Sequence, residues 1–427
     1  MPKNELFNGF SKLSRLERFN RLREMGALTD EDLKFFEEGG LKNNTIAENL
    51  IENAIGYFQL PLGVVTNFII DDHNPVIPMA VEETSIIAAL SKTAKWINEH
   101  GTISTSTEGD CIIGQIQIAQ VKDFHHLESK LLDNKPLFIE LANSTIAAGL
   151  FQRGGGVKDL YLRKISCPNG DLMAIIHLTM DPVDAMGANV INQVLEYLKA
   201  PIEELTHETV TMCILSNLND LKLTKAEVVI QNVGEDLGQR IEQASIFAEL
   251  DPYRAATHNK GVLNGIDPVL IATGNDWRAV EASIHSYAAR DGQYRAVTRW
   301  RYSNNTLSGE FKAPIVVGIA GGVTSIHPTA KIGLQMLGVK SAKHLSRIVA
   351  AVGLVQNLGA LRALCSEGII QGHMKLHLTN LMMMAGADEH ERGILRERIQ
   401  PLIDEKKRIS PQHLTDLLLE IRGKILE

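Results

Sequence analysis

A change of composition near residue 101 constrains the fold of this chain more than any other feature. Residues 101–110 are rich in Thr, Ser and Gly, and the run from Ile112 to Ile118 then alternates as a half-buried strand does. From there to about residue 217 the pattern predicts strand, helix, glycine-rich loop, strand, helix and strand. Helical and mixed patterns lie before and after it, so we expect a small α+β domain inserted into a larger one.

The segments outside this insertion are predicted to be mainly helical. Near the N-terminus Leu13, Leu16, Phe19 and Leu22 recur at helical spacing. Inside the insertion, Asp181 followed by Pro182 predicts the N-cap and first turn of a helix. The other expected elements are helices over 11–55, a strand over 64–70, a helix from Glu82 to about residue 98, a buried strand over 315–319, a helix over 340–364 and a charged helical tail from about residue 372.

Length and composition exclude several classes of protein. A chain of 427 residues, 44% hydrophobic and 22% charged, is typical of a globular protein with about two or three domains. The formal net charge of -8 argues against broad nucleic-acid binding, which needs a cationic surface. Four scattered cysteines without a C-x-x-C pair predict neither a disulfide framework nor a cysteine zinc site. The charged N-terminus and the lack of a long apolar run predict a cytoplasmic protein that does not bind membranes.

Several common catalytic motifs are missing. The chain has no G-x-G-x-x-G turn, no P-loop and no G-x-S-x-G elbow. His373 and His377 have the spacing of a zinc-binding pair, but Met374 stands where the metalloprotease motif needs glutamate. We therefore predict no metal site.

Four ionisable residues are candidates for catalysis, and each has a structural alternative. Glu83 follows Glu82 near a predicted helix start; it is either a first-turn acid favoured by the helix dipole or a general acid with a raised pKa. Lys260 precedes Gly261 and is either a solvated loop lysine or a ligand contact. Asp276 is either the cap of a helix beginning at Trp277 or a catalytic acid. His373 is either a structural histidine or a proton donor.

Two glycine-containing runs are candidates for anion binding. Small residues between Asp184 and Asn189 would let a phosphate approach the N–H groups of a helix start, or would serve tight helix packing at Gly187. The run from Arg153 to Gly156 is either an anion-binding loop or a hinge.

These runs together resemble the 3-hydroxy-3-methylglutaryl-CoA (HMG-CoA) reductases of the soluble bacterial class II type. Each motif is short, but they follow the order of the family across almost the whole chain. The matching stretches are residues 52–56 (Glu-Asn-Ala-Ile-Gly), 81–85 (Val-Glu-Glu-Thr-Ser), 184–189, 251–265, 274–281 and 367–377.

The resemblance implies catalytic roles for the four ionisable residues. The family passes two hydrides in turn from NAD(P)H to the thioester of HMG-CoA, giving mevalonate and CoA. Lys260 would stabilise the developing oxyanion and Glu83 would protonate the carbonyl oxygen of mevaldehyde. Asp276 would hold these two groups in one network, and His373 would protonate the departing CoA thiolate.

The resemblance also implies the binding sites and the fold class. Ser85, Arg254 and Asn264 would bind the substrate carboxylate, Arg254 through its planar fork. The dinucleotide would lie on Asp184, Ala185, Met186, Gly187, Ala188 and Asn189. The expected fold is α+β and multidomain: a mostly helical large domain over 1–109 and 218–369 with an N-terminal helical arm, an inserted ferredoxin-like, non-Rossmann small domain over 110–217, and a helical C-terminal flap over 370–427. A homodimer or a larger assembly of dimers is implied.

The choice between NADPH and NADH depends on one departure from the family. NADH-preferring members carry an aspartate shortly after Leu-Ala-Asn of the small domain, and here Ser144, Thr145 and Ile146 follow Leu141-Ala142-Asn143. No carboxylate would repel a 2′-phosphate and the two hydroxyls would donate to it, so we expect NADPH and biosynthetic reduction. The alternatives are NADH-linked mevalonate degradation and, more remotely, a Schiff-base enzyme with Lys260 as nucleophile.

Overall fold

The computed structural model describes residue 7 and residues 9–366, 378, 381–404 and 410–423. Their contacts divide the chain into two compact units. The first comprises residues 1–82 and 87–361, and the second comprises residues 83–86 and 362–427. Each unit is built on its own hydrophobic core.

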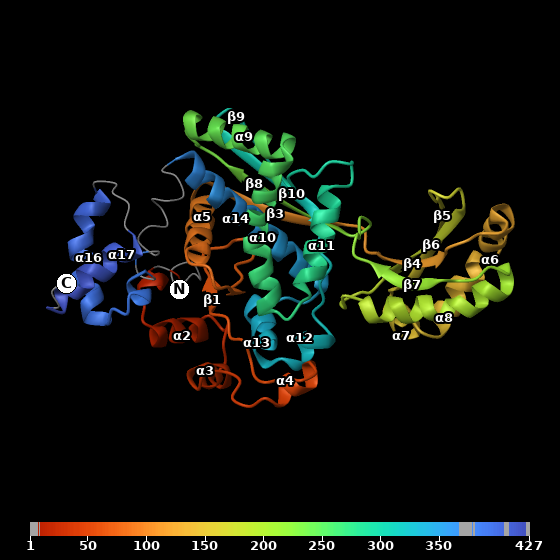
Figure 1. The fold of residues 1–427 in the computed structure, drawn as a ribbon, viewed down its shortest axis with the longest axis horizontal. Coiled ribbons are helices and arrows are strands. Elements are labelled where there is room, and N and C mark those ends of the chain that lie inside the picture. The colour runs from red at the N-terminus through yellow and green to blue at the C-terminus, as the bar shows by residue number, and fades with distance from the viewer. Residues whose placement is uncertain (1–6, 8, 367–377, 379–380, 405–409, 424–427) are drawn as a thin grey trace. The chain divides into compact units, whose positions relative to one another are not determined.

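The insertion is a four-stranded antiparallel sheet with two long helices on one face (Figure 1). Its strands lie side by side in the order β5-β6-β4-β7. Along the chain the order is β4 (Ile112–Ile118), α6 (Phe124–Ser144), the short α7 (Ala148–Gln152), β5 (Gly156–Ser166), β6 (Leu172–Asp181), α8 (Ala188–Thr206) and β7 (Met212–Ser216). This βαββαβ order confirms the ferredoxin-like prediction. The single strand expected between the helices is instead the β5–β6 hairpin.

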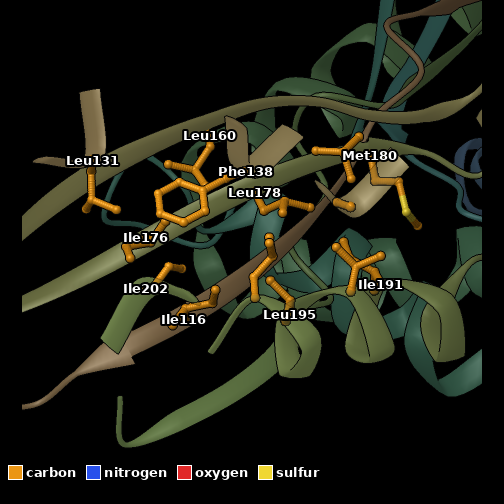
Figure 2. Close-up of a cluster of buried hydrophobic side chains, with 14 of the residues drawn as sticks. Ile116, Leu131, Phe138, Leu160, Ile176, Leu178, Met180, Ile191, Leu195 and Ile202 are labelled. Carbon is orange, nitrogen blue, oxygen red and sulfur yellow. The ribbon is translucent and has the colours of Figure 1, made fainter. Parts of the chain in front are cut away.

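The core of the insertion lies between this sheet and its helices. Figure 2 shows Phe138 of α6 and Leu195 of α8 close to Ile116, Ile176 and Leu178 of the strands. Alternate residues of each strand point to the same face, so one face of β4 and β6 is apolar and covered by both helices.

A second four-stranded antiparallel sheet forms part of the same unit, in the order β3-β8-β10-β9. Its strands are β3 (Gly101–Glu108), β8 (Leu223–Ile230), β9 (Thr298–Ser303) and β10 (Thr306–Pro314). The chain enters the insertion after β3 and returns at β8. The two crossings touch at Gly109, where φ is 68° and a Cβ would lie 2.2 Å from the Leu221 carbonyl oxygen. Only glycine fits there.

Helices form the rest of this unit. They are η1 (Phe10–Lys12), α2 (Arg15–Glu24), α3 (Asp30–Glu37), α4 (Thr45–Leu50), α5 (Ile86–His100), α9 (Glu235–Leu250), α10 (Pro252–Ala272), α11 (Trp277–Ala288), α12 (Gly322–Ile326), α13 (Pro328–Leu337) and α14 (Ala342–Cys365). The small antiparallel pair β1 (Leu62–Val65) and β2 (Ile77–Ala80) packs against α10 and α13. The predicted helical N-terminus is therefore confirmed as several short helices.

Four sequence-based predictions of local structure are wrong. The strand expected over 64–70 ends at Val65 because Asn67 adopts φ 68°. The helix expected from Glu82 begins only at Ile86. Residues 315–318 are buried and Ile319 is half-buried, but residues 315–319 form no strand. Asp181 caps no helix: its carboxylate accepts a hydrogen bond from the N–H of Val183, and α8 starts at Ala188.

Helix α14 is long and apolar enough to cross a membrane by length and composition alone. Of its most apolar window, 67% is buried inside the protein. Residues such as Val349, Leu354 and Leu358 lie fully covered, as in the central helix of a folded core.

The second unit has a small core of its own. Helices α16 (Glu389–Asp404) and α17 (Pro411–Ile421) bury a cluster that includes Leu378, Met382, Leu395, Leu414 and Leu418. The tail is therefore helical, as predicted. Its helices pack around a hydrophobic cluster of their own. His373 lies outside the described residues.

Candidate active site

Helix α10 carries three of the predicted site residues. Asp251 starts this helix: its carboxylate accepts a hydrogen bond from the N–H of Arg254 at 2.7 Å, and Pro252 occupies the first turn. Lys260 is thus a helical residue, which corrects its interpretation as a loop lysine. It is exposed, and Asn264 lies one turn further on the same face.

The opposite face of α10 is anchored by buried polar side chains. The amide oxygen of Asn259 accepts a hydrogen bond from the Val297 N–H at 3.0 Å. The Nε2 of His258 lies 2.6 Å from the hydroxyl of Thr298. Burial lowers the pKa of His258 to about 4, so its ring is neutral at physiological pH. These bonds fix the backbone immediately before Lys260 and therefore the origin of its side chain.

Asp276 is the N-cap of α11. Its carboxylate accepts a hydrogen bond from the Ala279 N–H at 3.1 Å, and the Arg278 guanidinium lies 3.7 Å away. Gly274 supports the turn with φ 67°, and a Cβ on it would press on Ala330 at 3.0 Å. The cap interpretation is confirmed, and it holds the carboxylate in a fixed direction at the end of the helix.

Glu83 and Ser85 belong to the second unit. Glu83 precedes α5, so it is not the first-turn acid of that helix. Ser85 has φ 77°, which is unusual for a residue other than glycine. Its Oγ is buried and has no hydrogen-bond partner in the described part of the chain. A buried hydroxyl left open in this way is suited to a ligand that supplies the missing bond.

The predicted dinucleotide residues form a loop and a helix start. Residues 182–187 join β6 to α8, with Val183 at φ 56° and Gly187 at φ 92°. A Cβ on Gly187 would lie 2.6 Å from Pro182 and 2.7 Å from Ile112, so Gly187 packs tightly against its own loop and β4 rather than against another helix. Within the described chain no side chain caps α8, and its first turn holds no acid. Its N–H groups therefore suit an anion such as a dinucleotide phosphate.

Comparison with known proteins identifies the family. The family model of hydroxymethylglutaryl-coenzyme A reductase matches residues 14–378. A 3-hydroxy-3-methylglutaryl-coenzyme A reductase of Archaeoglobus fulgidus is 44% identical over 90% of this chain and 89% of its own length. The class II enzyme of Streptococcus pneumoniae, solved with NADPH in open conformations, is 36% identical, with a TM-score of 0.81 over 84% of this chain and all of its own.

The chain belongs to the hydroxymethylglutaryl-coenzyme A reductase family. It is an NAD(P)H-dependent oxidoreductase of HMG-CoA, as the resemblance predicted. Its fold matches the class II members, which confirms the predicted fold class. A probable reductase of Borreliella burgdorferi, 33% identical over 88% of this chain and 87% of its own, agrees.

Sequence reasoning missed a half-buried carboxyl pair in this HMG-CoA reductase. Asp267 of α10 lies against Glu281 of α11; burial first, and then the charge of Glu281 and a hydrogen bond with it, raise the pKa of Asp267 to about 8. The available signal was spacing: Asp267 follows Lys260 by seven residues on the same face, inside an apolar run. The pair joins the helix of Lys260 to the helix that Asp276 starts.

Two further candidate segments of the reductase make close contacts within the small domain. A Cβ on Gly155 would lie 2.6 Å from the Asp181 carbonyl oxygen, so the run from Arg153 to Gly156 is a tightly packed turn. Ser144 and Thr145 follow Asn143 as expected, but their hydroxyls donate to the Leu141 carbonyl oxygen of α6. A 2′-phosphate would have to compete with that carbonyl oxygen.

Proposed function

We propose that this HMG-CoA reductase forms mevalonate and CoA from HMG-CoA by two hydride transfers from NADPH. The observation that supports this most is the face of the anchored helix α10 that carries exposed Lys260 and half-buried Asn264, followed in the chain by the fixed carboxylate of Asp276. A lysine and a carboxylate held on two packed helices suit a reaction in which an oxyanion forms and is then protonated. The family assignment favours this chemistry over the Schiff-base alternative.

The catalytic roles follow from the charge that each step develops. Lys260 stabilises the oxyanion formed when hydride reaches the thioester carbon, because an ammonium supplies both charge and a hydrogen bond. Asp276 organises Lys260 and Glu83, and Glu83 protonates the carbonyl oxygen of mevaldehyde. His373 protonates the CoA thiolate as it leaves.

The substrate carboxylate is assigned to Ser85, Arg254 and Asn264. The buried Oγ of Ser85, which has no hydrogen-bond partner in the described chain, supports this, because a carboxylate oxygen would accept a hydrogen bond from it. Arg254 has an anchored backbone at the start of α10 and a guanidinium that binds carboxylates in a bidentate manner.

The dinucleotide is assigned to Asp184, Ala185, Met186, Gly187, Ala188 and Asn189, where the open helix start of α8 supports a phosphate. When bound, the nicotinamide supplies the hydride; the chain supplies the binding loop. We further propose NADPH preference, cytoplasmic biosynthetic reduction and a homodimer or larger assembly, with NADH-linked degradation as the alternative.

Cofactor preference is tested at Ile146, whose side chain is 38% exposed just beyond α6. Ile146→Asp places a carboxylate where it would repel a 2′-phosphate and accept from a ribose hydroxyl. We expect the NADPH-to-NADH ratio of kcat/KM to fall by about 10-fold or more, whereas the neutral Ile146→Asn changes it little. A wild-type enzyme with a strong NADH preference would overturn the proposal.

The reaction itself is tested by following dinucleotide oxidation with HMG-CoA. Lys260→Ala should lower kcat by about 10²- to 10³-fold, as loss of an oxyanion partner does elsewhere. Lys34→Ala, an exposed helical lysine on α3, is the matched control and should retain wild-type kcat. If Lys260→Ala still turns over HMG-CoA normally, the oxyanion role is wrong. Borohydride trapping of substrate on Lys260 would instead support a Schiff base.

A further inference from the structure

Residues 315–318 are buried and Ile319 is half-buried, and none of them is part of a sheet, so their backbone groups need other partners. The N–H of Ile319 donates to the backbone carbonyl of Asp184 at 2.9 Å. The N–H of Gly318 donates to the amide oxygen of Asn275 at 2.8 Å. One residue of this segment therefore contacts the dinucleotide loop, and its neighbour contacts the turn before Asp276.

The contact at Gly318 is backbone against backbone. A Cβ on Gly318 would lie 2.7 Å from the Met186 nitrogen and 3.1 Å from the Ala185 carbonyl carbon. Both atoms belong to the main chain and cannot rotate away. No residue larger than glycine fits without displacing the loop that precedes α8.

Asn275 is itself held in one orientation. Its Nδ2 donates to the hydroxyl of Thr273 at 3.1 Å, and Thr273 is fully buried and donates to the Val269 carbonyl oxygen. The Asn275 backbone N–H donates to the Leu270 carbonyl oxygen at 2.8 Å. The amide oxygen that receives Gly318 therefore extends rigidly from the end of α10, one residue before Asp276.

The loop has a second attachment to the same unit. The Oδ1 of Asp184 accepts a hydrogen bond from the Ala342 N–H at 2.9 Å, where α14 begins. This bond stabilises the loop whether or not Asn275 is present. Loss of the Asn275 bond should therefore shift the loop relative to Asp276 without releasing it.

We propose that Asn275 and Gly318 are positioning residues that set the distance between the dinucleotide loop and the Asp276 carboxylate. This inference rests on the proposed function, which assigns the loop to NADPH and Asp276 to catalysis. Hydride transfer needs reacting atoms aligned to within a fraction of an ångström, so a displaced bridge weakens the chemical step more than binding.

The test compares Asn275→Ala and Gly318→Ala, alone and combined, with Ser245→Ala as control. Ser245 also accepts a backbone N–H, that of Trp300 at 2.9 Å, but lies on α9 away from both ends of the bridge. Each variant is assayed for kcat with NADPH and 4-deuterated NADPH, for the dissociation constant of NADPH by fluorescence, and for Tm.

We expect Asn275→Ala to lower kcat by about 10- to 100-fold and to raise the deuterium isotope effect, with a change below about 3-fold in the dissociation constant. Gly318→Ala should displace the loop and weaken NADPH binding by about 10-fold. Gly318→Ala should also lower kcat, and the losses of kcat and of Tm should be non-additive in the double variant, since both substitutions act through one bridge.

The proposal is overturned if Asn275→Ala matches Ser245→Ala in kcat and isotope effect, or if the losses of the two bridge variants are additive in both kcat and Tm. If wild-type protein binds NADPH but does not oxidise it with HMG-CoA, the proposed function fails. The additivity of the Tm losses then still decides whether the bridge exists.

Discussion

Two helices of this reductase begin in opposite ways. Helix α11 is capped by Asp276, whose carboxylate accepts a hydrogen bond from the N–H of Ala279. Helix α8 begins with Gly187, at φ 92°, and no side chain in the described chain caps it. The first helix start presents a fixed negative charge, and the second presents N–H groups and the positive end of a helix dipole.

The difference shows how one kind of structural element serves two purposes. A cap satisfies the helix and holds a carboxylate rigidly, which suits an acid that orders neighbouring groups. An open start leaves its donors for an anion, and the tight packing around Gly187 keeps the loop in place meanwhile. The variants below separate the structural part of each arrangement from its proposed chemistry.

The largest effect is expected at Asp276. Asn is as good an N-cap as Asp, so Asp276→Asn should keep Tm within about 1 °C while kcat falls by about 10²-fold or more. Asp276→Ala should lose the same activity and, in addition, about 1 kcal/mol of unfolding free energy. Steady-state kinetics and thermal melts measure the two separately.

The control for Asp276 is a cap without proposed chemistry. Asp123 starts α6 and accepts the His126 N–H at 3.0 Å. Asp123→Ala should cost a similar amount of stability and leave kcat unchanged. If Asp276→Asn keeps wild-type activity, Asp276 serves only as a helix cap and has no catalytic role.

Much of the fold could be predicted from sequence because burial of one face of a helix or strand gives a periodic pattern of apolar residues. The alternation from Ile112 to Ile118 predicted β4, and the ferredoxin-like fold predicted for the insertion is confirmed. Predictions failed where one local signal has two outcomes. Asp181 followed by Pro182 is equally suited to a helix cap or to the turn it makes with Val183, and only tertiary contacts decide.

The candidate site was only partly readable for a related reason. The cap at Asp276 has a clear sequence signature, whereas Lys260 was open between a loop lysine and a ligand contact, and Asn264 was named only through the resemblance. The Asp267–Glu281 pair depends on how two helices pack, and the bond from Gly318 to Asn275 joins residues 43 apart in sequence. The spacing of Asp267 is visible in the sequence, but its pairing with Glu281 and the bond to Asn275 cannot be read from a local pattern.

The second prediction concerns the open helix start. Gly187→Ala combines positive φ with close contact to Pro182, so we expect NADPH binding to weaken by about 10-fold, a loss of about 1.4 kcal/mol. Gly338→Ala is the matched control: φ is 63° at the end of α13, and a Cβ there would meet no atom within 4 Å. Gly338→Ala should lower Tm by a similar amount, because its backbone is strained in the same way, and it should bind NADPH normally. If both variants bind NADPH equally well, the start of α8 does not bind the dinucleotide.

The smallest effect is expected where α10 meets α11. Because the pKa of Asp267 is raised to about 8, the folded protein keeps a proton that the unfolded chain releases near pH 4. Between these values the folded state binds more protons, so this stabilising contribution is complete below pH 4 and is lost as pH rises towards 8. One such proton changes the unfolding free energy by at most about 1.4 kcal/mol per pH unit.

Asp267→Asn removes this proton while keeping the shape of the side chain. Its Tm should therefore fall less than that of the wild type when pH is raised from about 5.5 to about 7.5, the range within which the linkage operates. Asp236→Asn, at an exposed position of α9, should keep the wild-type slope. Since α8 has no part in this pair, NADPH binding should stay unchanged in Asp267→Asn. A weakened NADPH affinity would instead mean that the two helix starts are coupled through the packing of α10 on α11.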